Sequence, residues 1–222
     1  MIDYRFQWPV VWAKLPALLD GAAMTLQITA LSVLFGAVMG LVLMAGSMST
    51  NRVAHSAAQA WIEVARNTPV LFQIYVAYFG LGELGIHMSS FTAVLSAISF
   101  NTAGYLAEVF RGGYASVPKA QMRSARSLGM TALQANLHVM LPQMLRSTWF
   151  PFINQVQWAM LSSSLGLIVG LRELTGATQF AQSQSFRTFE FFLVAAAIYY
   201  VLAKLLQLGA QIIYRLMLGK RA

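Results

Sequence analysis

The chain has 222 residues, of which 58% are hydrophobic and only 10% are charged. Soluble proteins carry about 25% charged residues, so this composition indicates an integral membrane protein and excludes an ordinary soluble domain. The formal net charge is +8, but the basic residues are dispersed, without a basic run or an aromatic platform, so we expect no nucleic-acid binding. The chain contains no cysteine, which excludes disulfides, thiolate metal sites and thiol catalysis.

The N-terminal segment, residues 4–19, has the pattern of a helix that lies in the membrane interface. Trp8 and Trp12 are four residues apart, with Arg5 and Lys14 nearby. Tryptophan and basic side chains favour the boundary between lipid and water. We therefore expect this segment to lie on the membrane surface ahead of the first span.

Five further segments are apolar and long enough to cross a membrane, which takes about 20 residues of helix. The clearest is the first, because no charged residue occurs between Asp20 and Arg52. The predicted fold is all-α and integral to the membrane, one transmembrane domain over residues 1–222. The expected spans are residues 22–48, 54–82, 84–107, 147–171 and 189–214.

The distribution of lysine and arginine predicts the orientation of the chain. Loops that stay inside the cell carry an excess of these residues. With the N-terminus outside, only Arg5, Lys14, Arg172 and Arg187 remain outside. The inside then collects the other basic loop residues, namely Arg52, Arg66, Arg111, Lys119, Arg123, Arg126, Arg146, Arg215, Lys220 and Arg221. The C-terminus and the loop of residues 111–146 are therefore expected in the cytoplasm.

This loop is predicted to form two short helices separated by a glycine. Ser116 and Pro118 are suited to the start of the first helix, and Gly129 ends it. Its residues fall on two faces at helical spacings, with Lys119, Arg123 and Arg126 on one and Met122, Ala125 and Leu128 on the other. The loop thus offers separate basic and apolar faces to the cytoplasm.

The second helix is predicted to begin almost at once. Thr131 and Gln134 have the spacing of a capping box, and leucines recur every four residues from Leu133 until Pro142. Because so little chain separates the helices, we expect a positive φ at Gly129, which only glycine adopts without strain. Such a compact shape suits the groove of another protein, and an amphipathic hairpin lying on lipid is the alternative.

The same loop resembles the EAA signature of ATP-binding-cassette (ABC) importer permeases. The matching residues are Arg123-Ser124-Ala125, then Gly129, then Val139-Met140-Leu141-Pro142. Three further stretches are similar to the polar amino-acid uptake subfamily, which includes histidine, glutamine, glutamate, arginine and opine permeases. They are WIEVARNTPVLFQ at 61–73, YLAEVFRGGYASVPKAQ at 105–121 and LRELTGATQFAQSQSFRTFE at 171–190.

The resemblance implies the ABC type I importer permease fold and a place in the inner membrane of a bacterium, with a periplasmic N-terminus. It implies a periplasmic amino-acid-binding protein, a second permease subunit that is identical or different, and cytosolic ATPases as partners, besides membrane lipid. In this family the loop docks on the ATPase and couples its closure to the membrane path. The coupling residues carried over are Arg123, Ser124, Ala125, Leu128, Gly129, Leu141 and Pro142.

Two departures from the family pattern bear on function. The glutamate of the signature is Arg123 here and its first alanine is Ser124, so a negative contact has become positive. Where the family often has lysine and aspartate in span four, this chain has Leu161 and Ser162. An intramembrane carboxylate is therefore missing, and we expect a different permease subunit to carry more of the substrate contact.

Polar residues within the spans are candidates for a translocation path, although such groups also hydrogen-bond between helices simply to hold a bundle together, which we favour. The candidates are Gln73, Asn101, Thr102, Gln155, Ser162 and Ser163.

Two pairs with a spacing of three, Glu63 with Arg66 and Glu108 with Arg111, have the separation of ion pairs on a helix surface. Such pairs could gate or couple the path, but they need no function beyond structure.

Other features set limits on function. The chain has no G-x-x-x-x-G-K-[ST] phosphate loop, so any ATP is used by a partner subunit, and we expect no cofactor in this chain. The histidines are isolated from acidic residues and from one another, so no metal site is expected. No catalytic constellation emerges, and the prediction is a permease subunit of an ATP-driven amino-acid importer, not an enzyme. A self-contained membrane scaffold and a passive channel are the alternatives, and the sequence does not identify the amino acid.

Overall fold

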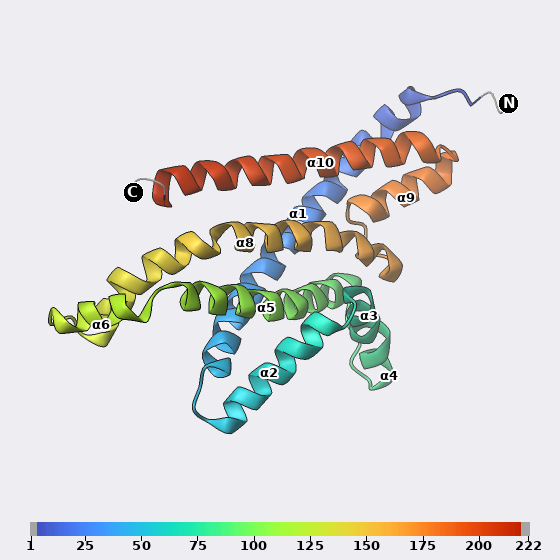
Figure 1. Cartoon of the computed structure of the whole chain (residues 1–222). Helices are drawn as coiled ribbons and strands as arrows, with labels where there is room; N and C mark the ends of the chain where they lie inside the picture. The colour runs from blue at the N-terminus through green and yellow to red at the C-terminus, as the bar shows by residue number, and fades with distance from the viewer. Residues whose placement is uncertain (1–3, 219–222) are drawn as a thin grey trace. The chain divides into compact units, whose positions relative to one another are not determined.

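The computed structural model describes residues 4–218, and throughout that range the regular structure is helical, without a strand (Figure 1). The all-α membrane fold predicted from the sequence is confirmed. Lys220 and Arg221, two of the basic residues used to predict the orientation, lie outside the described residues. The α-helices are α1 (Trp8–Ser47), α2 (Arg52–Asn67), α3 (Val70–Tyr75), α4 (Leu81–Glu83), α5 (Ser90–Ser116), α6 (Lys119–Ser127), α7 (Ala132–Ala135), α8 (Leu141–Ser162), α9 (Leu174–Ser185) and α10 (Thr188–Ile213).

Short segments of tighter or wider helix join several of these elements. A 3-10 helix, Ser163–Val169, follows α8, and a π-helical segment, Val76–Gly80, links α3 to α4. Two more π-helical segments are Asn136–Met140 and Tyr214–Leu218. Within residues 4–218, three helical runs are long and apolar enough to cross a membrane, Trp8–Ser47, Ser90–Ser116 and Thr188–Met217.

Several helix bounds differ from those of the expected spans: α5 is Ser90–Ser116 where residues 84–107 were expected, and α8 begins at Leu141 where residue 147 was expected. From Trp8 onward, the interfacial segment and the first span form one continuous helix, α1, with Pro16 accommodated within it. The second span is interrupted after α2, where Thr68 is extended and Pro69 is the N-cap of α3. A residue before proline is driven out of the helical region, which accounts for the break.

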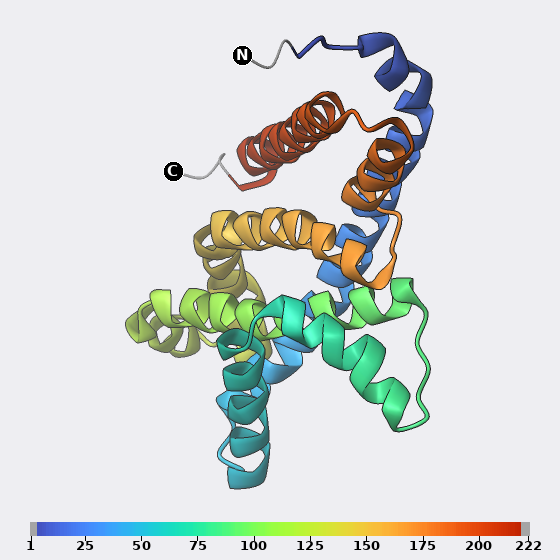
Figure 2. The same ribbon diagram turned by 90° about the vertical axis from the view of Figure 1, so that its right-hand side faces the viewer.

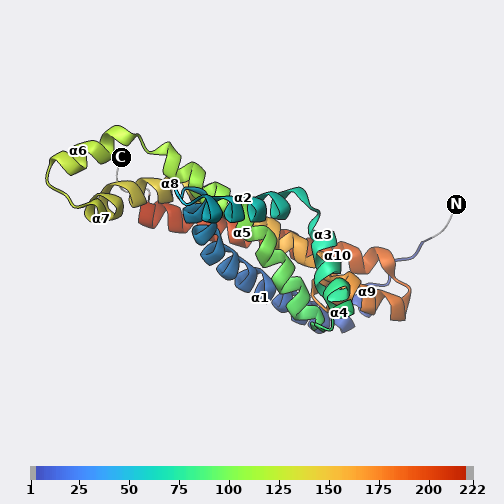
Figure 3. The same cartoon turned by 90° about the horizontal axis from the view of Figure 1, so that it is seen from below.

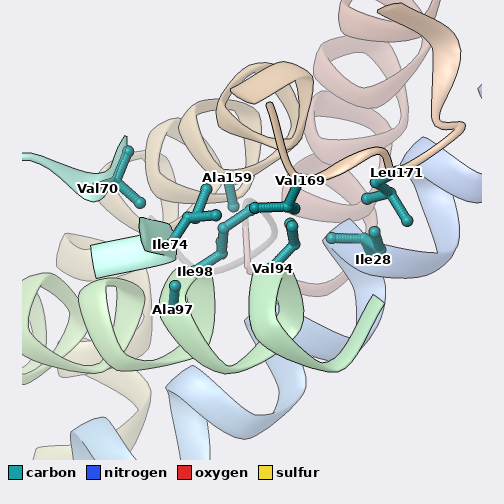
Figure 4. Packing of buried hydrophobic residues seen from close by; sticks show 9 residues of the cluster. All are labelled: Ile28, Val70, Ile74, Val94, Ala97, Ile98, Ala159, Val169 and Leu171. Carbon is teal, nitrogen blue, oxygen red and sulfur yellow. The ribbon is translucent and has the colours of Figure 1, made fainter. Parts of the chain in front are cut away.

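The chain divides into two compact units. The first comprises Met1–Val33, Pro69–Ser99 and Gln157–Leu206, and the second comprises Leu34–Thr68, Phe100–Val156 and Gln207–Ala222. One core cluster of the first unit consists of aliphatic side chains from five segments of the chain (Figure 4). Its members are Ile28, Val70, Ile74, Val94, Ala97, Ile98, Ala159, Val169 and Leu171.

In the second unit, small residues let helices approach one another closely. Gly36 and Gly40, one turn apart on α1, face α5, and a Cβ added at Gly36 would lie 2.7 Å from a carbon of Thr102. Ala103, between the two contacts on α5, is fully buried. Close approach of backbones is how helices pack in lipid, where burial of apolar surface drives association little.

This packing predicts the cost of enlarging Gly36. Gly36→Leu should destabilise the protein by about 1–3 kcal/mol, because the side chain overpacks the contact with Thr102. Gly112→Leu is the matched control, since a Cβ there meets no atom within 4 Å. Thermal unfolding of the detergent-solubilised protein measures both, and equal unfolding temperatures for the two variants would contradict the close α1 contact.

Candidate functional site

The loop between α5 and α8 folds into a hairpin of α6 and α7, as the sequence predicted (Figure 3). We call residues 118–140 the α6–α7 hairpin. Pro118 is the N-cap of α6. At the start of α8, the side-chain Nε2 of Gln143 donates a hydrogen bond of 2.5 Å to the side-chain Oε1 of Gln121. The hairpin is therefore tied back to the helix that follows it.

The turn at Gly129 is closed by three hydrogen bonds. The Met130 amide donates to the Ala125 carbonyl at 3.2 Å, and the Gly129 amide donates to the Arg126 carbonyl at 3.1 Å. This pair of bonds is a Schellman motif, which requires a left-handed residue, and Gly129 has the predicted positive φ, 87°. The guanidinium of Arg126 adds a bond of 2.8 Å to the Met130 carbonyl. The angle between the two helices is thus set by the backbone.

The predicted capping box is confirmed at the start of α7. The Gln134 amide donates to the Thr131 hydroxyl at 3.2 Å, and the Thr131 amide donates to the Gln134 side chain at 2.8 Å. Pro142, however, does not end the helix. The π-helical segment Asn136–Met140 intervenes, with the Leu141 amide bonded to the Asn136 carbonyl, and the chain continues into α8. A wider turn accommodates the proline, which has no amide to donate.

The predicted coupling residues of the hairpin differ in exposure. Ala125 is only 5% exposed, buried where α6 packs against α7, so its direct role is packing. Arg123 and Ser124 are exposed, and Leu128 is 82% exposed rather than packed with Ala125. Leu128 is the C-cap of α6 and so lies just past the last residue of that helix. Leu141 is exposed and Pro142 is partly exposed at the base of the hairpin.

The polar candidates of the second unit are buried. The Asn101 amide donates a hydrogen bond of 2.7 Å to the Ala65 carbonyl, which joins α5 to α2. Thr102 packs against Gly36, and Gln155 on α8 is 9% exposed. Within the described part of the chain, the Asn101 Oδ1, Thr102 Oγ1 and Gln155 Nε2 atoms have no hydrogen-bond partner. Asn101 thus holds helices together, and the role of all three in a path stays a prediction.

The polar candidates of the first unit are less uniform. Gln73 on α3 is partly exposed. Ser162 and Ser163 are buried, and the Ser163 hydroxyl donates to the Met160 carbonyl at 2.8 Å. A serine bonded to its own helix needs no substrate to satisfy it. The role of these three residues in a path also stays a prediction.

One of the two predicted ion pairs, Glu108 with Arg111, forms in the second unit, and Arg66 of the other predicted pair lies against Glu108. Arg111 donates to Glu108 through Nε at 3.0 Å and through Nη2 at 2.5 Å, which confirms that pair. Arg66 at the end of α2 lies 3.6 Å from the same carboxylate and stacks over the Tyr105 ring. Glu108 therefore joins α2 to α5, in addition to closing its own helix.

A buried carboxylate network lies in the first unit, and no residue pattern had indicated it. Glu173 is fully buried and caps α9, where it accepts a hydrogen bond of 2.8 Å from the Gly176 amide. It also accepts bonds from Tyr199 on α10 at 2.7 Å and from Thr25 on α1 at 3.3 Å. The network fastens α9 to α1 and α10 (Figure 2). Burial raises the pKa of the Glu173 carboxyl, although these hydrogen bonds oppose the shift.

Comparison with known proteins identifies the family of the chain. Residues 32–218 match the family described as the binding-protein-dependent transport system inner membrane component. The chain belongs to this family. It is a multi-pass membrane permease of a transporter complex, and not an enzyme.

Several members of known name are similar over nearly the whole permease. The glutamine transport system permease protein GlnP of Escherichia coli (strain K12) is 32% identical over 206 residues, covering 91% of this chain and 93% of GlnP. The octopine transport system permease protein OccM of Rhizobium radiobacter is 33% identical over 201 residues, covering 86% and 82%. The arginine transport system permease protein ArtQ of Bacillus subtilis (strain 168) is 30% identical over 194 residues, covering 87% and 89%.

Solved structures agree with this assignment. A chain in the crystal structure of an amino acid ABC transporter with histidines superposes with a TM-score of 0.90 at 31% identity, covering 96% of this permease and 100% of that chain. A chain of the MetNI methionine ABC transporter superposes with a TM-score of 0.75 at 19% identity, covering 95% and 98%, and supports the fold alone. The ABC type I importer permease fold is therefore confirmed.

The Glu173 network predicts how the stability of the permease depends on pH. The folded state keeps this proton at pH values where the unfolded chain has lost it, so the group stabilises the fold most at low pH. That contribution is lost as pH rises from the unfolded pKa through the raised folded pKa, by about 1.4 kcal/mol for each pH unit that separates the two. Glu173→Gln lacks the ionisation, so its unfolding temperature should gain on the wild type as pH rises across this window.

Thermal unfolding in detergent at a series of pH values measures this difference. Glu63→Gln is the control, because Glu63 is exposed on α2. Unfolding curves of Glu173→Gln and wild type that stay parallel at every pH would contradict a buried, titrating carboxyl.

Proposed function

We propose that this permease imports a polar amino acid and that the α6–α7 hairpin couples transport to a separate cytosolic ATPase. The permease forms half of the translocation path, beside a second permease subunit, and a periplasmic binding protein delivers the substrate. Relatives named for the transport of glutamine, octopine and arginine support the substrate class. They do not single out one amino acid.

The observation that carries the coupling role is the fixed and exposed geometry of the hairpin. The Schellman turn at Gly129 and the capping box at Thr131 hold two helices at a set angle. Leu128 and Leu133 are nevertheless largely exposed, at 82% and 67%. A loop that only connected two spans would need neither a fixed angle nor exposed leucines. A loop that transmits movement of a partner needs both.

This subunit is proposed to make fewer contacts with the substrate than the second permease subunit does. Leu161 and Ser162 offer no carboxylate to a cationic substrate, and Ser162 is buried. We therefore favour a different permease as the second subunit. Purification of the tagged permease in mild detergent tests the assembly: copurified ATPase and a second, different permease support it. A self-contained scaffold would copurify with neither the ATPase nor a second permease. A passive channel would transport the amino acid without ATP.

The hairpin predicts the effect of replacing Gly129. Gly129→Val should reach the membrane at normal levels but abolish most ATP-driven uptake, because a β-branched residue in the left-handed region costs on the order of 1 to 2 kcal/mol. A Cβ at this position meets no atom within 4 Å, so the strain is in the backbone and not in packing. The assay is uptake of labelled amino acid into cells, with permease levels measured by immunoblot.

Gly129→Asn is the matched control, because asparagine tolerates the left-handed region better than valine. It should retain much of the uptake. Full uptake by Gly129→Val would remove the coupling role of the turn, and loss of that variant from the membrane would assign Gly129 to folding instead.

The orientation is also open to direct test. The lysine and arginine bias favours an N-terminus in the periplasm and a C-terminus in the cytoplasm. An enzyme reporter fused after Ala222 should be active only as a cytoplasmic fusion. Activity of a periplasmic reporter at the same position would reverse the topology, and with it the side on which the hairpin lies.

A further inference from the structure

The surface of the hairpin is positive and has no acidic residue to balance it. No aspartate or glutamate occurs between Glu108 and Glu173, a stretch that contains the whole hairpin. Within α6, Lys119, Arg123 and Arg126 are all exposed. Of these, Arg126 is occupied in closing the Gly129 turn through its bond to the Met130 carbonyl. Lys119 and Arg123 therefore supply the charge that a partner can meet.

These two charges lie one turn apart on the same helix. Like charges at this spacing repel each other and weaken an isolated helix. The arrangement becomes favourable when an opposite charge lies against both residues. The backbone carbonyl of Arg123 accepts a hydrogen bond from the Ser127 hydroxyl at 3.1 Å, and the residue is exposed.

Apolar residues flank the charged face. Leu128 is the C-cap of α6 and Leu133 lies in the first turn of α7, and both side chains are mostly exposed. Exposed leucines beside exposed basic residues match a partner surface that is apolar at its centre and acidic at its rim, which is the general anatomy of a protein interface.

Anionic lipid is the other surface that attracts basic residues, but the hairpin lacks the residues that anchor a helix in the interface. No tryptophan, tyrosine or phenylalanine occurs in residues 119–140, whereas the N-terminal segment has Trp8 and Trp12. Lys119–Ser127 is also only 9 residues long. A fixed, short and aromatic-free hairpin fits a protein groove better than a lipid surface.

We propose that Arg123, with Lys119 beside it, pairs with carboxylates at the rim of the groove on the ATPase, and that this charge selects an acidic ATPase surface for this permease. The proposal rests on the coupling role of the hairpin given above. It adds the chemistry of the partner: acidic residues at the rim, opposite Arg123, and an apolar floor under Leu128 and Leu133.

Charge reversal tests the proposal on the purified complex of permease and its copurifying ATPase. Arg123→Glu should weaken retention of the ATPase by roughly tenfold or more, because like charges then face each other, and Arg123→Lys should retain it. Added salt should weaken the wild-type complex and have a smaller effect on Arg123→Glu. Arg52→Glu is the matched control, since Arg52 is an exposed basic residue on the same predicted side, at the first position of α2. It should behave as the wild type.

A chemical cross-link identifies the partner group. In the Arg123→Lys variant, a carbodiimide joins the new amine to a carboxylate that lies against it, and mass spectrometry then locates the linked peptides. A link to an aspartate or glutamate of the ATPase supports the proposal. Arg52→Lys, treated in the same way, should give no such link.

The outcomes separate this proposal from the proposed function. If the wild-type permease retains no ATPase, the coupling role fails, and the proposal with it. If the ATPase is retained but Arg123→Glu and Arg52→Glu hold it equally, at every salt concentration, the coupling role stands and the charge pairing is overturned. The permease is also tested for binding to vesicles of anionic lipid. If Arg123→Glu weakens this binding as much as it weakens ATPase retention, the charge is assigned to the membrane and the pairing is also overturned.

Discussion

A backbone amide or carbonyl without a hydrogen-bond partner is costly in hydrocarbon, and this constraint determines where the helices of the permease end. Helices end where nearby hydrogen bonds satisfy the backbone groups that are no longer paired within the helix. At Gly85 the Ile86 amide bonds back to Leu81, and at Gly170 the Leu171 amide bonds back to Gly166. Both glycines have positive φ, as Gly129 does. The same backbone motif thus ends helices of both units, and at Gly129 it also shapes the hairpin.

Local signals of this kind are what the sequence could predict. The hairpin follows from Pro118, Gly129 and the Thr131–Gln134 pair, all within one loop, and its first helix, turn and capping box are confirmed. The five-span outline rests on apolar length and stays a prediction. Pro142, where the leucine repeat stops, lies inside α8, because the π-helical segment before it accommodates the proline, and the residue pattern does not specify how wide a turn the chain forms.

Long-range contacts were beyond prediction from one sequence. Glu173 meets Thr25 and Tyr199, which are 148 and 26 positions away, and nothing in the composition of any of these segments indicates the meeting. The N-terminal segment also makes long-range contacts that the sequence does not indicate. The Tyr4 hydroxyl donates a hydrogen bond to the buried Glu190 carboxylate, and the backbone amide of Gln7 donates to the same carboxylate at 2.9 Å. That hydrogen bond raises the pKa of Tyr4. The candidate path residues depend on such contacts, so their sequence pattern alone could not separate lining from packing.

The glycines show that folding and coupling place separate demands on this chain. Gly36 and Gly113 are required by neighbours, since an added Cβ would lie 2.7 Å and 2.1 Å from carbons of Thr102 and Thr148. Gly129 has no such neighbour within 4 Å. Its left-handed backbone is held by the turn, and the leucine before it is exposed. Packing inside the permease explains the first two glycines but not an exposed turn of fixed angle. Under the proposed coupling role, that angle has to fit a surface outside the permease.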